Sequence, residues 1–282
     1  MKFVVFSSGS DGNCTLIQSE KMNILVDIGL TRKCIVSNLE ESGLTLKDIN
    51  AILITHEHVD HIKGLDVLIK ELDCKFFMSR GTYYAISKKW RNMERLAKSY
   101  DELKRKYEMG LVVLFDKEDN SAFYKEINLE DMNILPLPMF HDAAETVGFR
   151  IVSSEKMIVL ITDTGYVHEA LYDKIENADV YILESNHDPE ILMASDRPYE
   201  LKMRIISDHG HMSNVKSMLT LVDLIGNKTK HVLHAHISQE CNLSQIIEFE
   251  REKIFKEYDI DASNITFEIL APRRGKEYEI WK

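Results

Sequence analysis

Short apolar runs and amphipathic stretches follow one another along the chain. Short apolar runs are typical of buried strands, whereas apolar residues three and four positions apart indicate helices. Strands are predicted near residues 2–6, 13–18, 23–27, 51–54, 75–78, 111–115, 131–140, 147–153, 157–162, 179–184 and 230–234, with a C-terminal β segment near 265–281. Helices are predicted near residues 32–42, 61–72, 82–107, 167–176, 197–206, 213–225 and 239–257.

Several predicted strands end in a residue that can bind a metal or move a proton. These residues are Asp27, His141, Asp163, Glu184 and His236. A single Asp after a strand is commonly a helix N-cap or a turn residue. Open sheets, however, bind ligands in the crevice beyond one edge of their strands. Five such residues together therefore favour one shared site.

The densest group of candidate ligands comes directly after the apolar run at residues 51–54. Residues 55–61 read Thr-His-Glu-His-Val-Asp-His, which contains the pattern H-x-H-x-D-H. Imidazole nitrogen and carboxylate oxygen bind Zn²⁺ and related divalent cations, and Zn²⁺ takes about four such ligands. Three histidines and one aspartate in so short a segment predict a metal site rather than a polar loop with solvated side chains.

The order of Asp27, this histidine motif, His141, Asp163 and His236 resembles the five sequence motifs of the metallo-β-lactamase superfamily. Further segments are similar to the YycJ (WalJ) family of bacterial metallo-hydrolases: FSSGSDGNC at 6–14, FHDA at 140–143, TDTG at 162–165, ESNHD at 184–188, GHMSN at 210–214 and HIS at 236–238. The similarity extends over about residues 3–240. It implies an α/β fold, the metallo-β-lactamase αββα four-layer sandwich of two mixed β-sheets flanked by helices. It also implies a dinuclear metal centre and 5′-to-3′ exonuclease activity on DNA.

The resemblance also implies a role for each candidate ligand. His56, His58 and His141 would hold the first metal, Asp60, His61 and His236 would hold the second, and Asp163 would bridge the two. A carboxylate suits the bridging position because each of its oxygens can bind one cation. Asp27 is expected to orient the histidine loop through a hydrogen bond, as partners of ligating imidazoles usually do. The expected cofactors are two divalent ions per chain, Zn²⁺ or Mn²⁺, with Fe²⁺ also compatible; no organic cofactor is expected.

Asp60, Glu184 and His211 are predicted to take part in catalysis. In the tRNA 3′-processing relatives, a Glu after the strand that follows the bridging Asp works with the histidine of a downstream Gly-His-Ser/Thr motif. Glu184 and the segment GHMS at 210–213 are similar in order and spacing. By that resemblance His211 is the general acid and Glu184 orients it. The structural alternative is a helix-capping segment with a solvated histidine.

The predicted function is that of a dinuclear metal-dependent phosphodiesterase, a DNA exonuclease that uses a metal-bridging hydroxide. A phosphodiesterase of small molecules or cyclic nucleotides is the main alternative, against which the basic character of the predicted helix 82–107 argues. A thioester or lactam hydrolase would not need the acid pair of Glu184 and His211. A regulatory module with structural metals is disfavoured because Asp60 and His211 are both present.

The charge of the chain is unevenly distributed. The formal net charge is −11, which argues against a protein that coats itself in nucleic acid, because phosphate contacts come mainly from Lys and Arg. Basic residues nevertheless outnumber acidic ones in the predicted helix 82–107, where tyrosines lie between them. We therefore expect this helix to contact the DNA substrate, although a solvated helix face would have the same composition. The candidate nucleic-acid contacts are Lys88, Lys89, Arg91, Arg95, Arg197 and Arg204.

Length and composition fit one large domain. With 282 residues, 44% of them hydrophobic, the chain can bury a sizeable core,, and residues 1–282 are predicted to form a single domain. Four cysteines without C-x-x-C spacing suggest reduced thiols,. No segment approaches the roughly 18 consecutive apolar residues of a membrane span, and no secretory signal is recognised. A cytoplasmic location without membrane association is expected, and nothing in the sequence identifies a protein partner.

Overall fold

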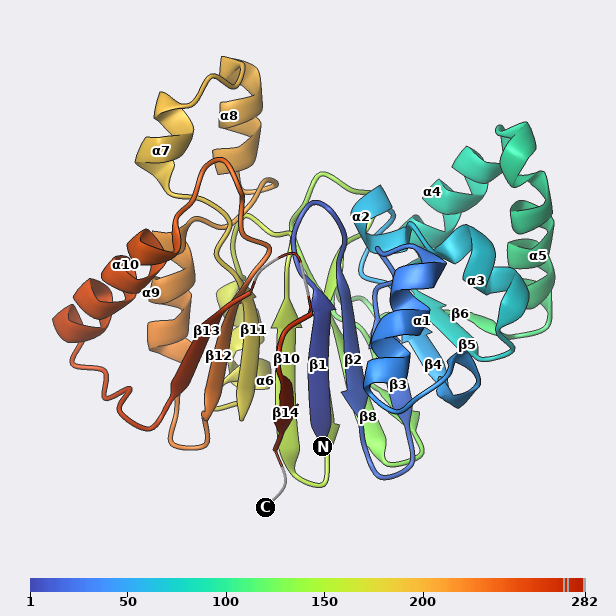
Figure 1. Ribbon diagram of the computed structural model, residues 1–282, viewed down its shortest axis with the longest axis horizontal. Coiled ribbons are helices and arrows are strands. Elements are labelled where there is room, and N and C mark those ends of the chain that lie inside the picture. The colour runs from blue at the N-terminus through green and yellow to red at the C-terminus, as the bar shows by residue number, and fades with distance from the viewer. Residues whose placement is uncertain (271, 273, 281–282) are drawn as a thin grey trace.

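Two seven-stranded β-sheets lie face to face at the centre of the protein (Figure 1). The computed structural model describes residues 1–270, 272 and 274–280. The first sheet has the order β14 (Glu277–Glu279), β1 (Lys2–Ser7), β2 (Cys14–Gln18), β3 (Asn23–Val26), β4 (Ala51–Leu53), β5 (Lys75–Met78) and β6 (Val112–Leu114). The second has the order β13 (Thr266–Ile269), β12 (His231–Ala235), β11 (Val180–Glu184), β10 (Lys156–Ile161), β9 (Val147–Ser153), β8 (Met132–Pro138) and β7 (Ile127–Leu129).

Both sheets are mixed in the same way. In the first sheet β14, β1, β2 and β3 pair antiparallel, whereas β3 to β6 pair parallel. In the second sheet β7 to β10 pair antiparallel, whereas β10 to β13 pair parallel. The carboxyl ends of the parallel strands lie at one edge of each sheet, where open sheets commonly bind ligands.

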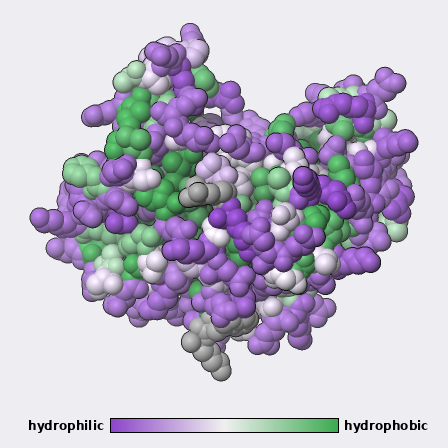
Figure 2. Space-filling model, viewed as in Figure 1, coloured by the Kyte–Doolittle hydropathy of each residue, from purple (hydrophilic) through white to green (hydrophobic). Residues whose placement is uncertain are grey.

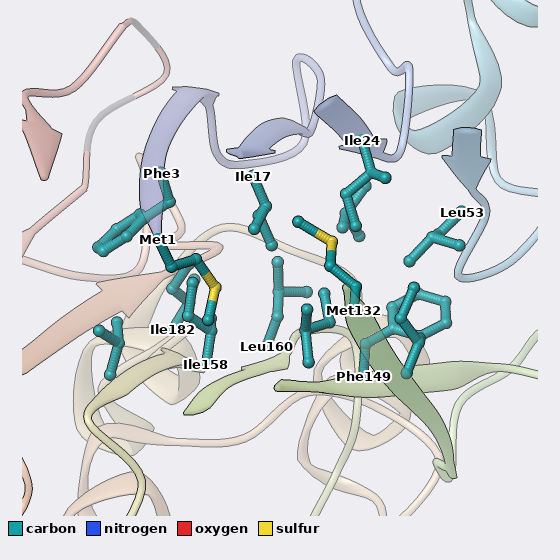
Figure 3. Close-up of a cluster of buried hydrophobic side chains, with 14 of the residues drawn as sticks. Met1, Phe3, Ile17, Ile24, Leu53, Met132, Phe149, Ile158, Leu160 and Ile182 are labelled. Carbon is teal, nitrogen blue, oxygen red and sulfur yellow. The ribbon is translucent and has the colours of Figure 1, made fainter. Parts of the chain in front are cut away.

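The interface between the sheets is apolar. Alternate residues of each strand point to the same face, so one set of apolar side chains faces the other sheet while the second set faces the outer helices. Figure 3 shows Phe3, Ile17, Ile24 and Leu53 of the first sheet opposite Met132, Phe149, Ile158, Leu160 and Ile182 of the second. All of these side chains are buried. Their removal from water is the main force that holds the two sheets together.

Helices cover the outer face of each sheet. Those that pack on the first sheet are α1 (Arg32–Glu41), α3 (Leu65–Glu71), α4 (Arg80–Arg91) and α5 (Ala97–Glu108). Those that pack on the second sheet are α6 (Tyr172–Ile175), α9 (Asn214–Leu224) and α10 (Ser244–Glu257). The remaining helices are α2 (Val59–Ile62), α7 (Pro189–Ala194), α8 (Tyr199–Ile206) and the 3₁₀ turns Leu46–Asp48, Glu94–Leu96 and Glu169–Leu171. The order helix, sheet, sheet, helix confirms the predicted four-layer sandwich.

The predicted helix 82–107 was wrong as a single element. It is a pair of helices, α4 and α5, joined by the 3₁₀ turn Glu94–Leu96, and Met93 between them is extended at φ −122° and ψ 109°. One straight helix of this length would be about 39 Å long. The turn folds α5 back against α4 and α3, so Trp90, Leu96 and Leu103 all reach the same buried cluster.

Other differences concern shorter elements. The predicted helix 61–72 is divided at Gly64 into α2 and α3, where a Cβ atom would lie 2.8 Å from the carbonyl oxygen of Leu30. The predicted C-terminal β segment 265–281 contains two strands, β13 and β14, in different sheets, and its residues 271, 273 and 281 lie outside the described residues. Strand β7 and helix α7 were not predicted. All four cysteines are free, and no helix within the described ranges is long and apolar enough to cross a membrane.

Candidate metal centre

The predicted metal-binding and catalytic residues meet at the edge where the parallel strands of both sheets end. The loop after β4 carries His56, His58, Asp60 and His61, and α2 begins within it. Asp27, His141, Asp163, Glu184 and His236 come from the ends of β3, β8, β10, β11 and β12 or from the residues just after them. In Figure 1 this edge lies at the top of the sandwich, between the projecting pairs α7–α8 and α4–α5.

Three of these residues adopt a backbone conformation that is uncommon outside glycine. Asp27, Asp163 and His236 have φ angles of 58°, 55° and 51°. Such a conformation costs on the order of 1 kcal/mol or more for a residue with a side chain. Each residue lies one or two positions after the end of a strand, where the left-handed backbone turns the chain at the edge of the sheet. The fold therefore holds strain at the positions that deliver these three side chains.

The first group of candidate ligands consists of His56, His58 and His141, whose nearest ring nitrogens all lie within 4.8 Å of one another. His141 Nδ1–H donates to the carbonyl oxygen of Gly210 at 3.0 Å, which leaves Nε2 facing Nδ1 of His58 at 3.3 Å. His56 Nδ1 lies 3.0 Å from the hydroxyl of Thr55. Its Nε2 is buried and has no hydrogen-bond partner among the described residues.

The second group consists of Asp60, His61, Asp163 and His236, with ligand atoms within the same 4.8 Å limit. Asp163 lies between the two groups. Its Oδ2 is 3.1 Å from His61 Nε2, and its Oδ1 is 3.4 Å from His236 Nε2 and 3.8 Å from His141 Nε2. A carboxylate in this position faces both groups of imidazoles at once.

The chemistry of the two groups fits divalent cations. His56 Nε2, His236 Nε2 and Asp163 Oδ2 are buried without a hydrogen-bond partner among the described residues, and leaving a buried polar atom without a partner costs about 1–3 kcal/mol. A metal ion would supply the missing partner for all three atoms. The nitrogen and oxygen donors are of the types that Zn²⁺ and similar ions bind. The chain thus has clusters suited to divalent metal binding.

The charges of this site depend on one another. Burial would raise the pKa of the Asp163 carboxyl, but His236 and His61 hold it well below its usual range. Burial would lower the pKa of His236, but Asp163, Asp60 and Glu184 raise it to about 10. Burial would likewise lower the pKa of His61, which Asp163 and Asp27 raise well above its usual value. The buried carboxylates therefore require positive charge close by, whether on protonated imidazoles or on metal ions.

Asp27 and Thr55 hold the histidine loop in place. Asp27 Oδ2 accepts from His61 Nδ1–H at 2.7 Å, which leaves His61 Nε2 directed toward Asp163. Asp27 also accepts from the backbone N–H of Thr55 at 2.8 Å and from its hydroxyl at 2.8 Å. The hydroxyl of Thr55 in turn contacts His56 and His61. The sequence predicted a hydrogen bond from the histidine loop to Asp27, and the structure has one at His61. The contribution of Thr55 was missed, because a Thr before a histidine motif has no recognisable signal.

Glu184 and His211 lie next to the second group. Glu184 is fully buried, and its Oε1 accepts from His211 Nδ1–H at 2.7 Å and from His236 Nδ1–H at 3.0 Å. Burial would raise the pKa of the Glu184 carboxyl, but the two histidines lower it to about 2, and the same carboxylate raises the pKa of His211 against the effect of burial. The ring of His211 lines a cleft whose wall also includes Asp60, Asp163 and His236. His211 thus faces the same space as the candidate ligands.

This cleft has a volume of about 310 Å³ and is bounded on one side by α8. Figure 2, drawn from the same side as Figure 1, shows that the upper edge of the molecule is hollowed between the two projecting helix pairs. Arg197 and Arg204 line the cleft, paired with Glu240 and Asp142 respectively. Asp142 was not predicted, although its Oδ1 lies 3.2 Å from His141 Nε2. Lys88, Lys89, Arg91 and Arg95 do not line this cleft and belong to α4 and the turn after it.

Close backbone contacts fix the loop that carries Asp60. The N–H of Asn13 donates to the carbonyl oxygen of Asp60 at 2.7 Å, and the N–H of Gly29 donates to the carbonyl oxygen of Asn13 at 2.8 Å. A Cβ atom on Gly29 would lie 1.6 Å from the Asp60 carbonyl oxygen. Only glycine allows this approach. The segment after β3 therefore touches the histidine loop through Gly29, which has no side chain.

Comparisons with known proteins agree with this arrangement. The family model described as "Beta-lactamase superfamily domain" matches residues 22–237. Exodeoxyribonuclease WalJ of Streptococcus pneumoniae is 37% identical over 245 residues, which are 87% of this chain and 84% of that protein. Exodeoxyribonuclease YycJ of Bacillus anthracis is 33% identical over 257 residues, 91% of this chain and 90% of that protein. The solved metallo-β-lactamase fold protein YhfI from Bacillus subtilis matches at 14% identity with a TM-score of 0.66, covering 98% of each chain, and so shares the fold.

Replacing Gly29 by alanine should move the loop that carries Asp60 and His61. We expect Gly29→Ala to lower both the metal content per chain and the free energy of unfolding, because the new methyl group cannot coexist with the Asp60 carbonyl. Elemental analysis and urea unfolding would measure the two effects. Gly275→Ala is the matched control, since its Cβ would meet only ordinary contacts, the nearest at 3.5 Å. If both variants kept the wild-type metal content and stability, the close approach at Gly29 would not constrain the site.

Proposed function

Because the chain belongs to the metallo-β-lactamase superfamily, and within it to the family of the WalJ and YycJ exodeoxyribonucleases, we propose that it is a dinuclear metal-dependent DNA exonuclease. It is a metal-dependent hydrolase. The observation that carries the proposal is the position of Asp163 between two groups of imidazoles, with the Glu184–His211 pair facing the same cleft. Action from the 5′ end is expected from the family resemblance.

The arrangement supports the ligand roles that the family resemblance implies. His56, His58 and His141 would hold one metal, and Asp60, His61 and His236 would hold the other, with Asp163 shared between them. Two bound divalent ions would supply a hydroxide at neutral pH and neutralise charge on the phosphate. Asp27 fixes the tautomer and direction of His61 by accepting its Nδ1–H,. Zn²⁺ or Mn²⁺ would suit these donors, and Fe²⁺ is compatible with them.

The leaving oxygen of a phosphodiester needs a proton, which we assign to His211. Glu184 accepts from His211 Nδ1–H at 2.7 Å and raises the pKa of that imidazole, so a proton is held on the ring close to the cleft. Nε2 of His211 is then free to donate to the departing 3′-oxygen. Glu184 also accepts from His236, and thus fixes one candidate ligand and the proton donor with the same oxygen. Asp60 lies at the open side of the site, where its side chain is 22% exposed, and it is the ligand that we expect to lie nearest to the substrate.

The activity itself is tested with end-labelled single- and double-stranded DNA and purified metal-loaded protein. We expect immediate release of label from a 5′-labelled strand and progressive shortening of a 3′-labelled strand that retains its label. Asp163→Asn, which removes one charge from the shared carboxylate, should abolish both and serves as the control for contaminating nucleases. Turnover of cyclic nucleotides with no cleavage of DNA would replace this proposal by a small-molecule phosphodiesterase.

The metal content should be about two ions per chain, because the site has donors for two. Asp60→Ala and His236→Ala should each lower the content to about one, since the first group of imidazoles remains intact. His209→Ala, at an exposed histidine outside the clusters, is the control and should change nothing. Because His61 and His236 hold protons in the metal-free protein, metal binding releases protons and should strengthen as the pH rises,. A wild-type content of one that neither variant changes would exclude the second site.

The role of His211 is tested by varying the leaving group. His211→Ala should retain both metals and DNA binding but lose roughly 10²–10⁴-fold in turnover of DNA. The same variant should be nearly normal on an aryl phosphodiester, because nitrophenolate leaves without protonation. Glu184→Gln should cause a smaller loss, and the two losses should not add if the residues act as one unit. Equal losses on both substrates would show that His211 positions the phosphate or supports the fold.

A further inference from the structure

A second groove lies between α4 and α5, outside the metal cleft. It has a volume of about 390 Å³, and four tyrosines line it, two from each helix: Tyr83, Tyr84, Tyr100 and Tyr107. The hairpin of α4 and α5 creates this groove, because one straight helix would have spread the tyrosines along its length. Tyr83 belongs to the buried core on the outer face of the first sheet and Tyr100 packs against it, which leaves Tyr84 and Tyr107 as the two exposed tyrosines of the groove.

The aromatic rings form a connected and partly open surface. Tyr83 contacts Tyr107 with ring centroids 4.8 Å apart and Tyr84 with centroids 5.5 Å apart. Tyr83 is buried, but Tyr84 is 57% and Tyr107 40% exposed. Ser87 also lines the groove, next to Tyr83. A flat ligand would cover the exposed rings of Tyr84 and Tyr107.

The rim of the groove is positive in a chain whose formal net charge is −11. Lys88, Arg91 and Lys104 line it, with Glu108 as the one acidic lining residue. Lys88 and Arg91 form no ion pair with any residue in the described part of the chain, and Lys104 has one loose pair with Glu108 at 3.8 Å between exposed side chains. Cations that the protein leaves without partners beside exposed aromatic rings suit a ligand that has both flat bases and phosphates.

Helix α4, which forms one wall of the groove, is connected to the segment that carries a candidate metal ligand. Helix α4 starts at the same edge of the sheet, where Ser79 Oγ donates to the carbonyl oxygen of Glu145 at 2.7 Å and the N–H of Gly81 donates to Glu145 Oε2 at 2.8 Å. Glu145 follows the candidate ligand His141 by four residues. A second cavity adjoins the groove through Tyr84 and is lined by two basic and two acidic residues: Arg80, Lys117, Asp116 and Glu145. Lys117 is paired with Glu145 at 2.7 Å, so this cavity connects the His141 loop with the tyrosines without adding net positive charge.

We propose that this groove binds a single-stranded segment of the nucleic acid whose end is cleaved at the metal centre. Bases stack on Tyr84 and Tyr107, and adjacent phosphates contact Lys88, Arg91 and Lys104. The proposal rests on the proposed function, because it places the strand that leads to the cleft. It also divides the predicted nucleic-acid contacts: Lys88 and Arg91 line the groove, whereas Lys89 and Arg95 of the same segment do not.

This division provides a matched test. Binding is measured by fluorescence anisotropy with metal-loaded protein and a single-stranded DNA oligonucleotide whose terminal linkages are nuclease-resistant phosphorothioates. Lys88→Glu/Arg91→Glu and Lys89→Glu/Arg95→Glu change the net charge equally at exposed positions of one helical hairpin. We expect the first pair to weaken binding roughly tenfold or more and to flatten the salt dependence by about 0.7 for each phosphate that the protein no longer neutralises. The second pair should weaken binding less than about threefold, through screened long-range charge alone.

The stacking interaction is tested by removing either partner. Tyr84→Ala/Tyr107→Ala should weaken binding roughly tenfold or more, and Tyr84→Phe should retain wild-type affinity because the ring remains. An oligonucleotide with a run of abasic sites should bind the wild type more weakly than the intact strand. The double alanine variant should bind both strands equally, since it no longer has the rings on which bases stack. Metal content and circular dichroism check that each variant is folded.

The outcomes separate the groove from the nuclease activity, because binding is measured without cleavage. Equal weakening by the two charge-reversal pairs, or equal sensitivity of wild type and double alanine variant to abasic sites, would overturn the proposed groove whether or not DNA is hydrolysed. Preserved binding selectivity in a protein that fails to hydrolyse DNA would refute the proposed activity and leave the groove as a nucleic-acid site.

Discussion

The structure depends on the neutralisation of buried negative charge where the two sheets meet. Asp27, Asp163 and Glu184 are almost completely buried, and an isolated carboxylate in such a place would be very costly. Each is surrounded by imidazoles, hydroxyls or backbone N–H groups. Asp27 finds its partners in the first half and Glu184 in the second, whereas Asp163 contacts imidazoles of both. This requirement explains why so many polar residues lie at one edge of an otherwise apolar sandwich. It also explains why the same edge is suited to cations, which neutralise the charge that the imidazoles only partly balance.

The architecture meets this requirement by dividing the site between its halves. The first sheet provides Asp27 and the histidine loop, whereas the second provides His141, Asp163, Glu184 and His236. Direct contacts connect the two halves: Asp163 Oδ2 lies 3.1 Å from His61 Nε2, and the N–H of His236 donates to the hydroxyl of Ser8 at 2.8 Å. The apolar interface beneath, with Leu53 opposite Phe149 (Figure 3), sets the distance between the sheets. Small displacements in that interface would therefore change the distances between the site residues of the two sheets.

The sequence predicted the strands and the residues at their ends because both signals are local. An apolar run followed by Asp27 or Asp163 can be recognised without knowing what lies opposite. The histidine loop was likewise visible because its members are neighbours in the chain. Contacts between distant residues left no such signal: Asp142 pairs with Arg204, 62 positions away, and the turn at Met93 depends on what α5 packs against. The left-handed backbone of His236 was also unpredictable, because the conformation reflects the demands of the site and not the preference of the residue,.

The division of the site between the sheets has a consequence for biogenesis. During synthesis the histidine loop emerges early, while His236 and the strand β14 that pairs with β1 emerge near the end. Pairings between such distant segments form late, because closing a long loop costs chain entropy before any contact stabilises it. A nascent chain that ends before β12 lacks His236, one of the four members of the second group of candidate ligands. The hydrolytic centre therefore forms only after β12 and β14 have been synthesised and both sheets have docked, so translation products that end before these strands would be inert toward nucleic acids.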